Sequence, residues 1–435
     1  MVNFPPNIPI LLDGRPVEKI TAFLFPNGGN EDPQKLRANE GKSFIGSYVL
    51  GMGFTFDDTN PEATPIAEMH RLIEQNPKNA EVIFPYIGGE EVNSSPTHAY
   101  YRYAIDFFDR DEDECWKDYP ELMAIIKEKV KPDRDKQKRD ALRIKWWQYA
   151  EKRPGLKRAI AGSDWVLVCS IVSKHLAFVF LPSQFVFAHR LAIFPFEFAS
   201  VFSILQSKIH EVFSYFFSST LEDRINYAPS DCFETFPFPE ETLTPNPPLT
   251  PPLPSWERGA GGEGLEAIGK TYYEYRAALM VQNNQGLTDT YNRFHDPHED
   301  DPEILKLREL HSQMDCAVLD AYGWQDLENT CGFALDYLDI EPDALPPETQ
   351  DRVESGDLFF TTAPEAAAFD ILIRGNTAKR GKLPWRYKWT EAIHDEVLAR
   401  LLALNQERYE AEIRLGVHSK SAARSRETTL DFTDS

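Results

Sequence analysis

Three polar side chains of different hydrogen-bonding type stand two residues apart in the 435-residue chain: Glu222, Arg224 and Asn226. If the backbone is extended there, alternate side chains point to one face and the three lie together. Arginine pairs with guanine, asparagine pairs with adenine, and glutamate accepts from the amino group of cytosine. The spacing therefore favours a short edge that reads bases in a DNA groove, with a polar surface loop as the alternative.

A basic stretch lies further upstream, between Lys127 and Arg158, with thirteen Lys or Arg against five Asp or Glu. Such cations neutralise phosphates and release counterions, which gives affinity for nucleic acid without sequence preference. The candidates for phosphate contacts are Lys131, Arg134, Lys136, Lys138, Arg139, Arg143 and Lys145, with Trp146, Trp147 and Tyr149 interleaved among and after them. The alternative is a solvated helix face on which Asp133, Asp135 and Asp140 pair with these cations.

Two histidines among acids, His295 and His298, would suit a metal ion by residue type. Pro297 stands between them, however, and the sequence offers no distant partner. A loop between two helices is therefore favoured over a metal site.

Catalytic motifs are the next possibility. Gly51-Met52-Gly53 lacks the acidic strand end of a cofactor-binding turn. Asn246-Pro247-Pro248-Leu249 resembles the box that holds a flipped adenine, but its fourth residue is not aromatic and it lies in a low-complexity segment. The residues form no evident nucleophile set or magnesium-nuclease spacing. We therefore expect no catalytic, cofactor-binding or metal-binding residue in this chain.

The net charge of -23 would usually argue against a nucleic-acid partner, but the charge is uneven. Between Ala321 and Glu365 there are eleven acids against Arg352 alone, whereas the basic stretch has the opposite balance. The five cysteines form no Cys-x-x-Cys pair, which favours reduced thiols. No apolar run is long enough to span a bilayer, so we expect a cytoplasmic protein without a membrane partner.

Apolar runs predict the scaffold beneath the Glu222–Asn226 segment. Trp165–Ile171, Leu176–Leu181 and Phe185–Phe194 are rich in Val, Ile and Phe and predict a β-meander. Apolar residues then recur every three or four positions from Phe198 to Phe216, which predicts one helix with a buried face.

Composition divides the chain into segments. Residues 1–240 mix strands with helices, including a basic helix over Asp133–Tyr149, and residues 241–264 form a Pro- and Gly-rich linker or insertion. Residues 265–417 predict a helical domain, and residues 418–435 a disordered tail. The predicted helices of this domain are Leu265–Gln282, Pro302–Tyr322 and Thr390–Glu412. The predicted fold class is α+β: a domain of mixed β-sheet and helix, followed by an all-α C-terminal domain.

Several motifs occur in the order found in one family. They include Phe44-Ile45-Gly46-Ser47, Pro85-Tyr86-Ile87-Gly88-Gly89-Glu90-Glu91-Val92-Asn93, Val130-Lys131-Pro132-Asp133-Arg134, Trp146-Trp147, Thr235-Phe236-Pro237-Phe238-Pro239, Gly286-Leu287-Thr288, Tyr291-Asn292-Arg293-Phe294-His295-Asp296-Pro297 and Met314-Asp315-Cys316-Ala317-Val318-Leu319-Asp320-Ala321-Tyr322-Gly323-Trp324. Together they resemble the C-terminal half of MmeI-like type II restriction–modification enzymes, single polypeptides that join a nuclease, an adenine-N6 methyltransferase and a target recognition domain.

The resemblance implies that residues 1–240 are a DNA target recognition domain and that residues just before the Phe-Pro-Phe-Pro turn contact bases. It also implies that the S-adenosylmethionine site, the adenine pocket and the nuclease lie in the family's N-terminal half. We therefore expect double-stranded DNA as partner and no methyl transfer by this chain alone. Two alternatives stay open: a specificity subunit that works with a separate methyltransferase or endonuclease chain, and a non-DNA interaction remnant.

Overall fold

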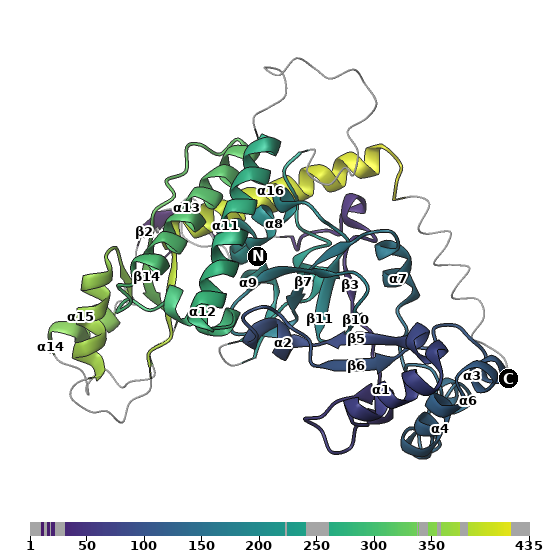
Figure 1. Ribbon diagram of the computed structural model, residues 1–435. Coiled ribbons are helices and arrows are strands. Elements are labelled where there is room, and N and C mark those ends of the chain that lie inside the picture. The colour runs from purple at the N-terminus through teal and green to yellow at the C-terminus, as the bar shows by residue number, and fades with distance from the viewer. Residues whose placement is uncertain are drawn as a thin grey trace.

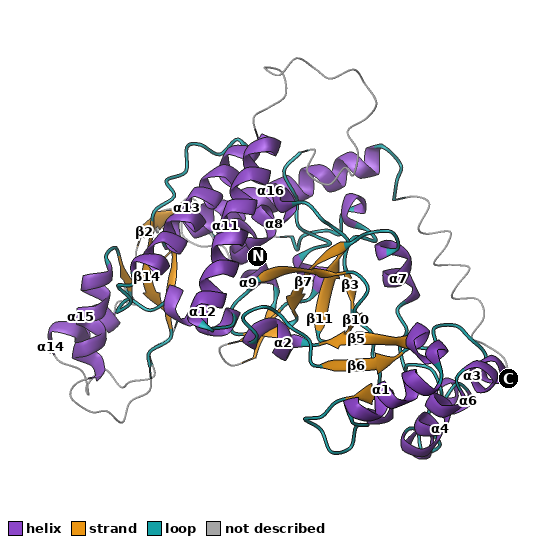
Figure 2. Cartoon of the chain, viewed as in Figure 1, coloured by secondary structure: helices purple, strands orange, loops and turns teal. Residues whose placement is uncertain are grey.

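The structure is a computed structural model that describes residues 10–12, 15–17, 19–21, 31–221, 224–240, 261–336, 338, 347–354, 358–374 and 382–418. Sheets occupy the centre, a group of long helices lies to one side, and short helices lie at the opposite end (Figure 1). Figure 2 shows that strands and helices are intermixed up to residue 240 and that helices predominate afterwards. The predicted α+β class is confirmed.

The central sheet is antiparallel, with strand order β3-β11-β7-β9. Its strands are β3 Phe44–Ile45, β11 Leu191–Phe194, β7 Trp165–Ser170 and β9 Phe178–Pro182. Five of the six residues of β7 are buried, as its continuous apolar run predicts. The predicted meander is wrong in its order, because β11 returns to the edge of β7 opposite β9. The chain between them, β10 Val186–Phe187, pairs instead in parallel with β5 Ile83–Ile87.

A second sheet has the order β10-β5-β6-β4, with β6 at Arg102–Ile105 and β4 at Thr55–Phe56. The other short elements of this part of the chain are α1 Ile66–Gln75, α2 Gly89–Ser94, α3 Glu112–Asp118, α7 Pro154–Ile160 and the 3₁₀ turns η1 Arg37–Asn39, η2 Met52–Phe54 and η3 Pro77–Val82. A separate pair, β1 Ile10–Leu12 and β2 Arg15–Val17, is antiparallel.

The predicted helix over Phe198–Phe216 is two helices, α8 Ala199–Gln206 and α9 Lys208–Phe217. Ser207 is extended, with ψ 160°, and its hydroxyl donates to the carbonyl of Ile204 over 2.7 Å. Asp315 of a later helix accepts from the backbone N–H of Lys208 over 2.8 Å. This contact from a distant part of the chain satisfies a donor at the start of α9, and local periodicity could not reveal the break.

A small antiparallel sheet, β12-β13-β8, carries the segment predicted to read bases. Its strands are β12 Ser219–Leu221, β13 Arg224–Asn226 and β8 Val172–Ser173. A short helix, α10 Pro229–Cys232, follows β13. Strand β12 begins just after α9 ends, so the chain passes directly from α9 into this sheet.

The predicted basic helix over Asp133–Tyr149 is also wrong. The chain forms α4 Pro120–Lys129 and then two short helices, α5 Lys131–Arg134 and α6 Asp140–Ile144. Its last residues are buried in the second hydrophobic core together with Phe54 and Phe56. Burial of Trp146 and Trp147 there pulls the chain out of helical geometry.

The C-terminal region is mainly helical. Pro302–Tyr322 (α13) and the helix capped by Thr390 (α16 Glu391–Arg414) are confirmed, and the predicted Leu265–Gln282 helix is α11 Gly261–Asn283. The other helices are α12 Leu287–Phe294, α14 Pro347–Glu354 and α15 Ala363–Arg374. The all-α expectation needs a correction, because β15 Phe359–Phe360, β14 Cys331–Leu335 and β16 Trp385–Trp389 form an antiparallel sheet.

The largest hydrophobic core joins both segments of the chain. It includes Phe178 and Phe194 of the central sheet, Tyr272 of α11, Met314 of α13 and Leu401 of α16. The division into separate domains at 1–240 and 265–417 stays a prediction, and the linker and tail calls fall mostly outside the described residues. Among the described residues, no helix has the length and hydropathy of a membrane span.

Candidate nucleic-acid interface

Strand β13 presents one face to solvent and one to the core. Arg224 is exposed and Asn226 is half-buried, whereas Ile225 between them is fully buried. The alternation expected from an extended backbone is therefore present for these two residues. Glu222 lies outside the described residues. Within the described part of the chain, no ion pair engages Arg224.

Ile171 connects this small sheet to the central one. Its backbone N–H donates to the carbonyl of Arg190 over 2.9 Å, and its carbonyl accepts from the N–H of Tyr227 over 2.7 Å. The chain therefore changes partners at Ile171, from β11 on one side to β13 on the other. Arg190, which is exposed, is therefore joined through Ile171 to Tyr227, the residue after Asn226, by two backbone hydrogen bonds. We call Arg190, Arg224 and Asn226 the hairpin edge.

An exposed aromatic pair adjoins the hairpin edge. The rings of Tyr48 and His189 have centroids 4.6 Å apart, and Tyr48 is 37% exposed. Partial burial lowers the pKa of His189, and the cations Arg190 and Arg153 lower it further. His189 is therefore neutral at pH 7. Arg153 forms an ion pair with Glu151 over 2.5 Å, so Arg190 is the cation here that no ion pair engages among the described residues.

Buried aromatic residues hold β13 in place from below. Tyr227, fully buried, packs its ring against Phe178 and Phe194 and shares a hydrogen bond of 3.1 Å between its hydroxyl and Nε2 of His210. Burial lowers the pKa of His210 to about 3, so the ring is neutral. Burial also raises the pKa of the Tyr227 phenol well above its usual value. Strand β13 therefore packs on buried aromatic side chains and a buried histidine that carry no charge.

The Phe-Pro-Phe-Pro turn, residues 236–239, belongs to the same hydrophobic core beneath β13. The amide of Asn39 donates to the carbonyls of Phe233 over 3.0 Å and Phe236 over 2.8 Å, and it is itself buried. From the other side, Asn405 of α16 donates to the carbonyl of Thr235 over 2.6 Å. One buried amide from each end of the chain therefore fixes the turn, which has few backbone partners of its own.

The basic stretch is organised differently, and Arg134 is its clearest correction. This side chain is 1% exposed and donates to the carbonyls of Val49 over 3.1 Å and Gln148 over 3.2 Å. Its guanidinium lies 5.8 Å from the ring centroid of Phe54, and burial lowers its pKa. A side chain enclosed in this way ties loops together and does not reach a phosphate.

The other six predicted phosphate contacts fall into two groups. Three form ion pairs with neighbouring acids, as the alternative interpretation predicts: Lys131 with Asp135, Lys136 with Asp133 and Arg143 with Asp140. Lys138, Arg139 and Lys145 are exposed, and no ion pair engages them among the described residues. The interleaved aromatic residues are buried and belong to the core: Trp146 is 4%, Trp147 7% and Tyr149 6% exposed.

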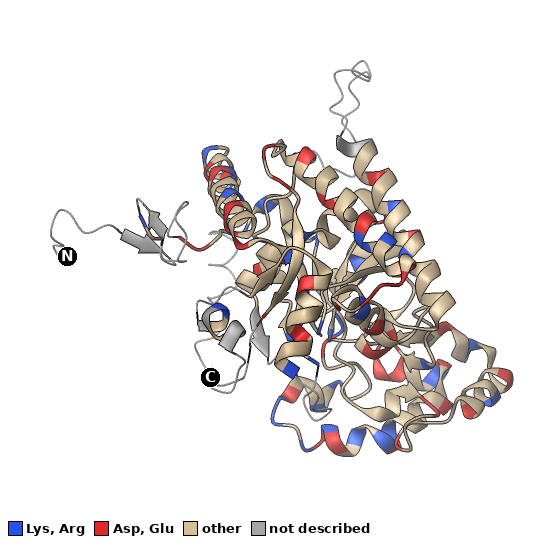
Figure 3. Ribbon diagram, turned by 90° about the vertical axis from the view of Figure 1, so that its left-hand side faces the viewer, with Lys and Arg blue, Asp and Glu red and all other residues tan. Residues whose placement is uncertain are grey.

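Placement separates the two regions further. Helices α4 and α6 lie at the lower right of the molecule, away from α2, which packs against β8 of the small sheet (Figure 1). At the bottom of the molecule, Lys and Arg positions are interspersed with Asp and Glu positions along the ribbon (Figure 3). Net charge in a stretch of sequence therefore overstates the cations available to a partner.

Two further sequence predictions are resolved by local packing. A Cβ atom added at Gly53 would lie 2.6 Å from Cβ of Lys129, so Gly51-Met52-Gly53 allows α4 to pack closely against η2 and leaves no room for a phosphate. His295 and His298 lie in the turn between α12 and α13, as predicted. His298 contacts Asp370 over 2.9 Å, and the described residues include no group of three or more metal-ligating side chains.

Comparison with known protein families shows that residues 57–240, which include β13, match the model of a target recognition domain. The matching family model is that of MmeI, so the resemblance to MmeI-like enzymes that the sequence indicates is confirmed over this segment. No curated protein matches the chain.

Among solved structures, the chain is similar to the Type IIL restriction–modification enzyme MmeI in complex with DNA. The TM-score is 0.50 at 17% identity, and the match covers 81% of this chain. At this identity the likeness establishes the fold. The match covers 39% of the solved MmeI chain, so the chain spans about two fifths of that protein's length.

The sequence predicts the extended segment at β13, but it gives no indication that Arg190 and the Tyr48–His189 pair are exposed at the surface. Arg190 stands between two apolar runs that were interpreted as one strand, Phe185–Phe194. The polar dipeptide His189-Arg190 after Ala188 is a turn signal that could have divided that strand, as the structure does.

Proposed function

We propose that this chain recognises a short sequence of double-stranded DNA, as the target recognition part of a restriction–modification system. The observation that carries the proposal is the match of residues 57–240 to the MmeI target recognition domain. Within that segment, β13 carries an exposed arginine and a half-buried asparagine at alternate positions, with a buried residue between them. These are side chains whose donor and acceptor geometry suits guanine and adenine.

In this proposal the hairpin edge enters a groove and Arg224 and Asn226 contact base edges. Glu222 is proposed to join them as a third base contact. Arg190 supplies a cation at the same edge. Lys138, Arg139 and Lys145, whose charges are available, contact phosphates and add affinity without sequence preference. Lys131, Lys136 and Arg143 contribute less, because each must first leave its acidic partner.

A salt titration of the full chain with a cognate duplex and a scrambled duplex tests the proposal. Cognate sites come from selection on a randomised duplex library. We expect one enriched motif, and an affinity that falls with rising salt on both duplexes because phosphate contacts release counterions. Failure to retain any duplex at low salt would contradict the proposal and favour a partner other than DNA.

The match of residues 57–240 to a target recognition domain supports a further proposal about how the site is used. We infer that the chain selects the target for a methyltransferase or endonuclease chain that binds S-adenosylmethionine. Adenine methylation is then expected on mixing the two chains with a radioactive methyl donor. Labelling of DNA by this chain alone would contradict that division of labour.

A further inference from the structure

The hairpin edge is supported by the C-terminal region of the chain as well as by its own domain. Strand β8, which pairs with β13, continues directly into Lys174 and His175. These two residues form a turn that packs against the C-terminal region. Contacts that fix the position of this turn therefore also help to fix the register of β13 against β8.

Arg386 of β16 makes the main contacts to the turn. One Nη atom lies 2.8 Å from Nδ1 of His175, and the other donates to the carbonyl of Lys174 over 3.2 Å. Its Nε donates to Asp336 over 2.8 Å, which fixes the plane of the guanidinium. The side chain is largely buried, and the residue is 9% exposed.

These contacts define the hydrogen-bonding state of His175. Because Arg386 can only donate, Nδ1 of His175 accepts, and the ring proton is on Nε2. Nε2 then donates to Oδ1 of Asn292 on α12 over 3.0 Å. The imidazole is therefore neutral and held from both sides by residues of the C-terminal region.

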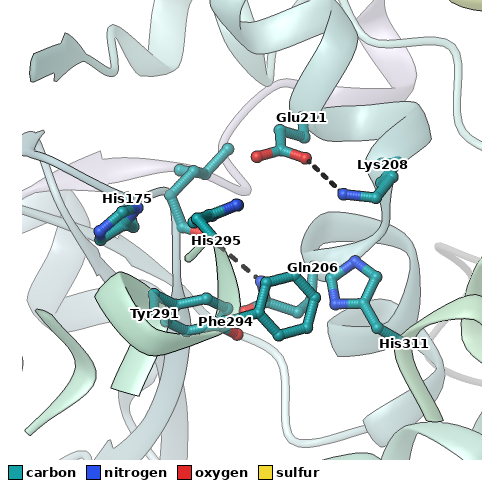
Figure 4. Close-up of a pocket in the computed structure, with 9 residues that line it drawn as sticks. His175, Gln206, Lys208, Glu211, Tyr291, Phe294, His295 and His311 are labelled. Carbon is teal, nitrogen blue, oxygen red and sulfur yellow. Dashed lines mark hydrogen bonds and ion pairs between the residues drawn. The ribbon is translucent and has the colours of Figure 1, made fainter. Parts of the chain in front are cut away.

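A second histidine reinforces the turn. His295 stacks on His175, with ring centroids 4.9 Å apart, and its Nδ1 accepts from the backbone N–H of Tyr387 over 3.0 Å. Figure 4 shows the two rings side by side at the edge of a small cavity, with Lys208 and Glu211 on its far side. Lys208 donates to the carbonyl of Tyr387 over 2.8 Å. Residues 386 and 387 of β16 thus contact the turn, α9 and the α12–α13 connection together.

The contacts to the Lys174–His175 turn are directional hydrogen bonds, which constrain its position more tightly than apolar packing would. An apolar interface tolerates small shifts, whereas a hydrogen-bonded arginine and imidazole fix distance and angle together. Strand β8 has only two residues in the small sheet, so it cannot set its own register strongly. The register of β13 against β8 therefore depends on the position of the Lys174–His175 turn.

We propose that Arg386 is a positioning residue for base recognition: through Lys174 and His175 it fixes β8, and through β8 it fixes the direction in which Arg224 and Asn226 point. The inference rests on the proposed function for its effect on DNA. It assigns to the C-terminal region a share in sequence specificity, although that region lies outside the matched residues 57–240.

The test compares Arg386→Gln with Arg134→Gln in the full chain. Arg134 is a matched control, because it is also buried, at 1% exposed, and donates to the carbonyls of Val49 and Gln148, far in sequence from the turn and from β16. Asp336→Asn is a milder second variant, which loosens Arg386 but removes no side-chain volume. Discrimination between the selected duplex and single-mismatch duplexes is measured together with amide hydrogen exchange of residues 171–175 and 224–227.

For Arg386→Gln we expect discrimination to fall about tenfold and exchange of residues 224–227 to accelerate, with Asp336→Asn intermediate. Arg134→Gln should lower the melting temperature without either effect. A folded Arg386→Gln variant with unchanged discrimination and exchange would overturn the proposal, and so would equal effects in Arg134→Gln. If the wild-type chain shows no base preference, the proposed function fails, and hydrogen exchange alone still decides whether Arg386 holds β13.

Discussion

The hairpin edge and the basic stretch differ in how their charged groups are used. The basic stretch has many more cations, but of its seven candidate phosphate contacts one is buried and three are paired with acids one turn away. The hairpin edge has only two arginines, yet both are exposed and neither forms an ion pair among the described residues. Availability and rigid support, rather than the number of cations, therefore distinguish a surface that can read a partner from one that keeps a chain soluble.

The largest effect is expected inside the basic stretch, on stability. Arg134→Ala removes two hydrogen bonds to buried carbonyls and leaves a cavity beside Phe54. We expect a loss of about 2–4 kcal/mol in the free energy of unfolding, measured by urea denaturation. The salt dependence of DNA binding by the folded variant should not change. A reduced salt slope with unchanged stability would mean that Arg134 is a phosphate contact after all.

At the hairpin edge, Arg190→Ala is expected to weaken binding to the selected duplex by about 1–2 kcal/mol, because no acid pairs with it in the part of the chain that the structure describes. Stability should change little, since the side chain is exposed. Binding is measured by fluorescence anisotropy at constant salt, with Arg143→Ala as the paired control. Equal losses in the two variants would remove the distinction between available and paired cations.

Acid should weaken the support of the hairpin edge, because its buried histidines are neutral. Burial lowers the pKa of His175 and of His210 to about 3, against about 6.5 in an unfolded chain. The unfolded state therefore binds these protons first as the pH falls. Each histidine should lower the free energy of unfolding by about 1.4 kcal/mol per pH unit between about pH 6 and pH 3.

One buried acid opposes this trend. Burial raises the pKa of Asp315 to about 7, so its contribution to stability rises as the pH falls from 7 toward the pKa of an unfolded aspartate. His210 provides the cleaner test, because its neighbours Tyr227, Ser214 and Phe236 carry no charge. In His210→Gln the pH dependence should lose about one proton relative to the wild type. An unchanged pH dependence would show that His210 is not buried in its neutral form.

The smallest effect is expected for exposed lysines. Lys138→Ala should weaken binding to all duplexes alike and lower the salt slope by about 0.9, whereas Lys136→Ala should lower it by less because Asp133 competes for the charge. Salt titrations of both variants on the same duplex measure the difference. A larger change in Lys136→Ala would show that the Lys136–Asp133 pair does not persist when DNA is present.

Elements with strong local signals could be predicted from the sequence. Asp301 caps α13 by accepting from the N–H of Glu303 over 2.9 Å, and Thr390 caps α16, so both helices begin where their capping residues indicate. The exposure of Arg224 and burial of Ile225 follow from alternation alone. These features depend on a few neighbouring residues, which is why a single sequence reveals them.

Features set by distant parts of the chain could not be predicted. The break at Ser207 depends on Asp315, and the burial of Arg134 depends on the carbonyls of Val49 and Gln148. Strand β16 has the sequence Trp385–Trp389 with charged residues at alternate positions, which is too short and too polar to identify without its partner β14. Long-range hydrogen bonds therefore determine these three features.

The most direct test of the account is the base preference of the full chain, selected from a randomised duplex library, for the wild type and for Arg224→Ala. The account predicts one enriched motif for the wild type. In Arg224→Ala a single base pair of that motif should lose its preference, at a cost of about 1–3 kcal/mol on the wild-type site. An identical motif in both proteins, with equal affinity, would contradict base reading by the hairpin edge.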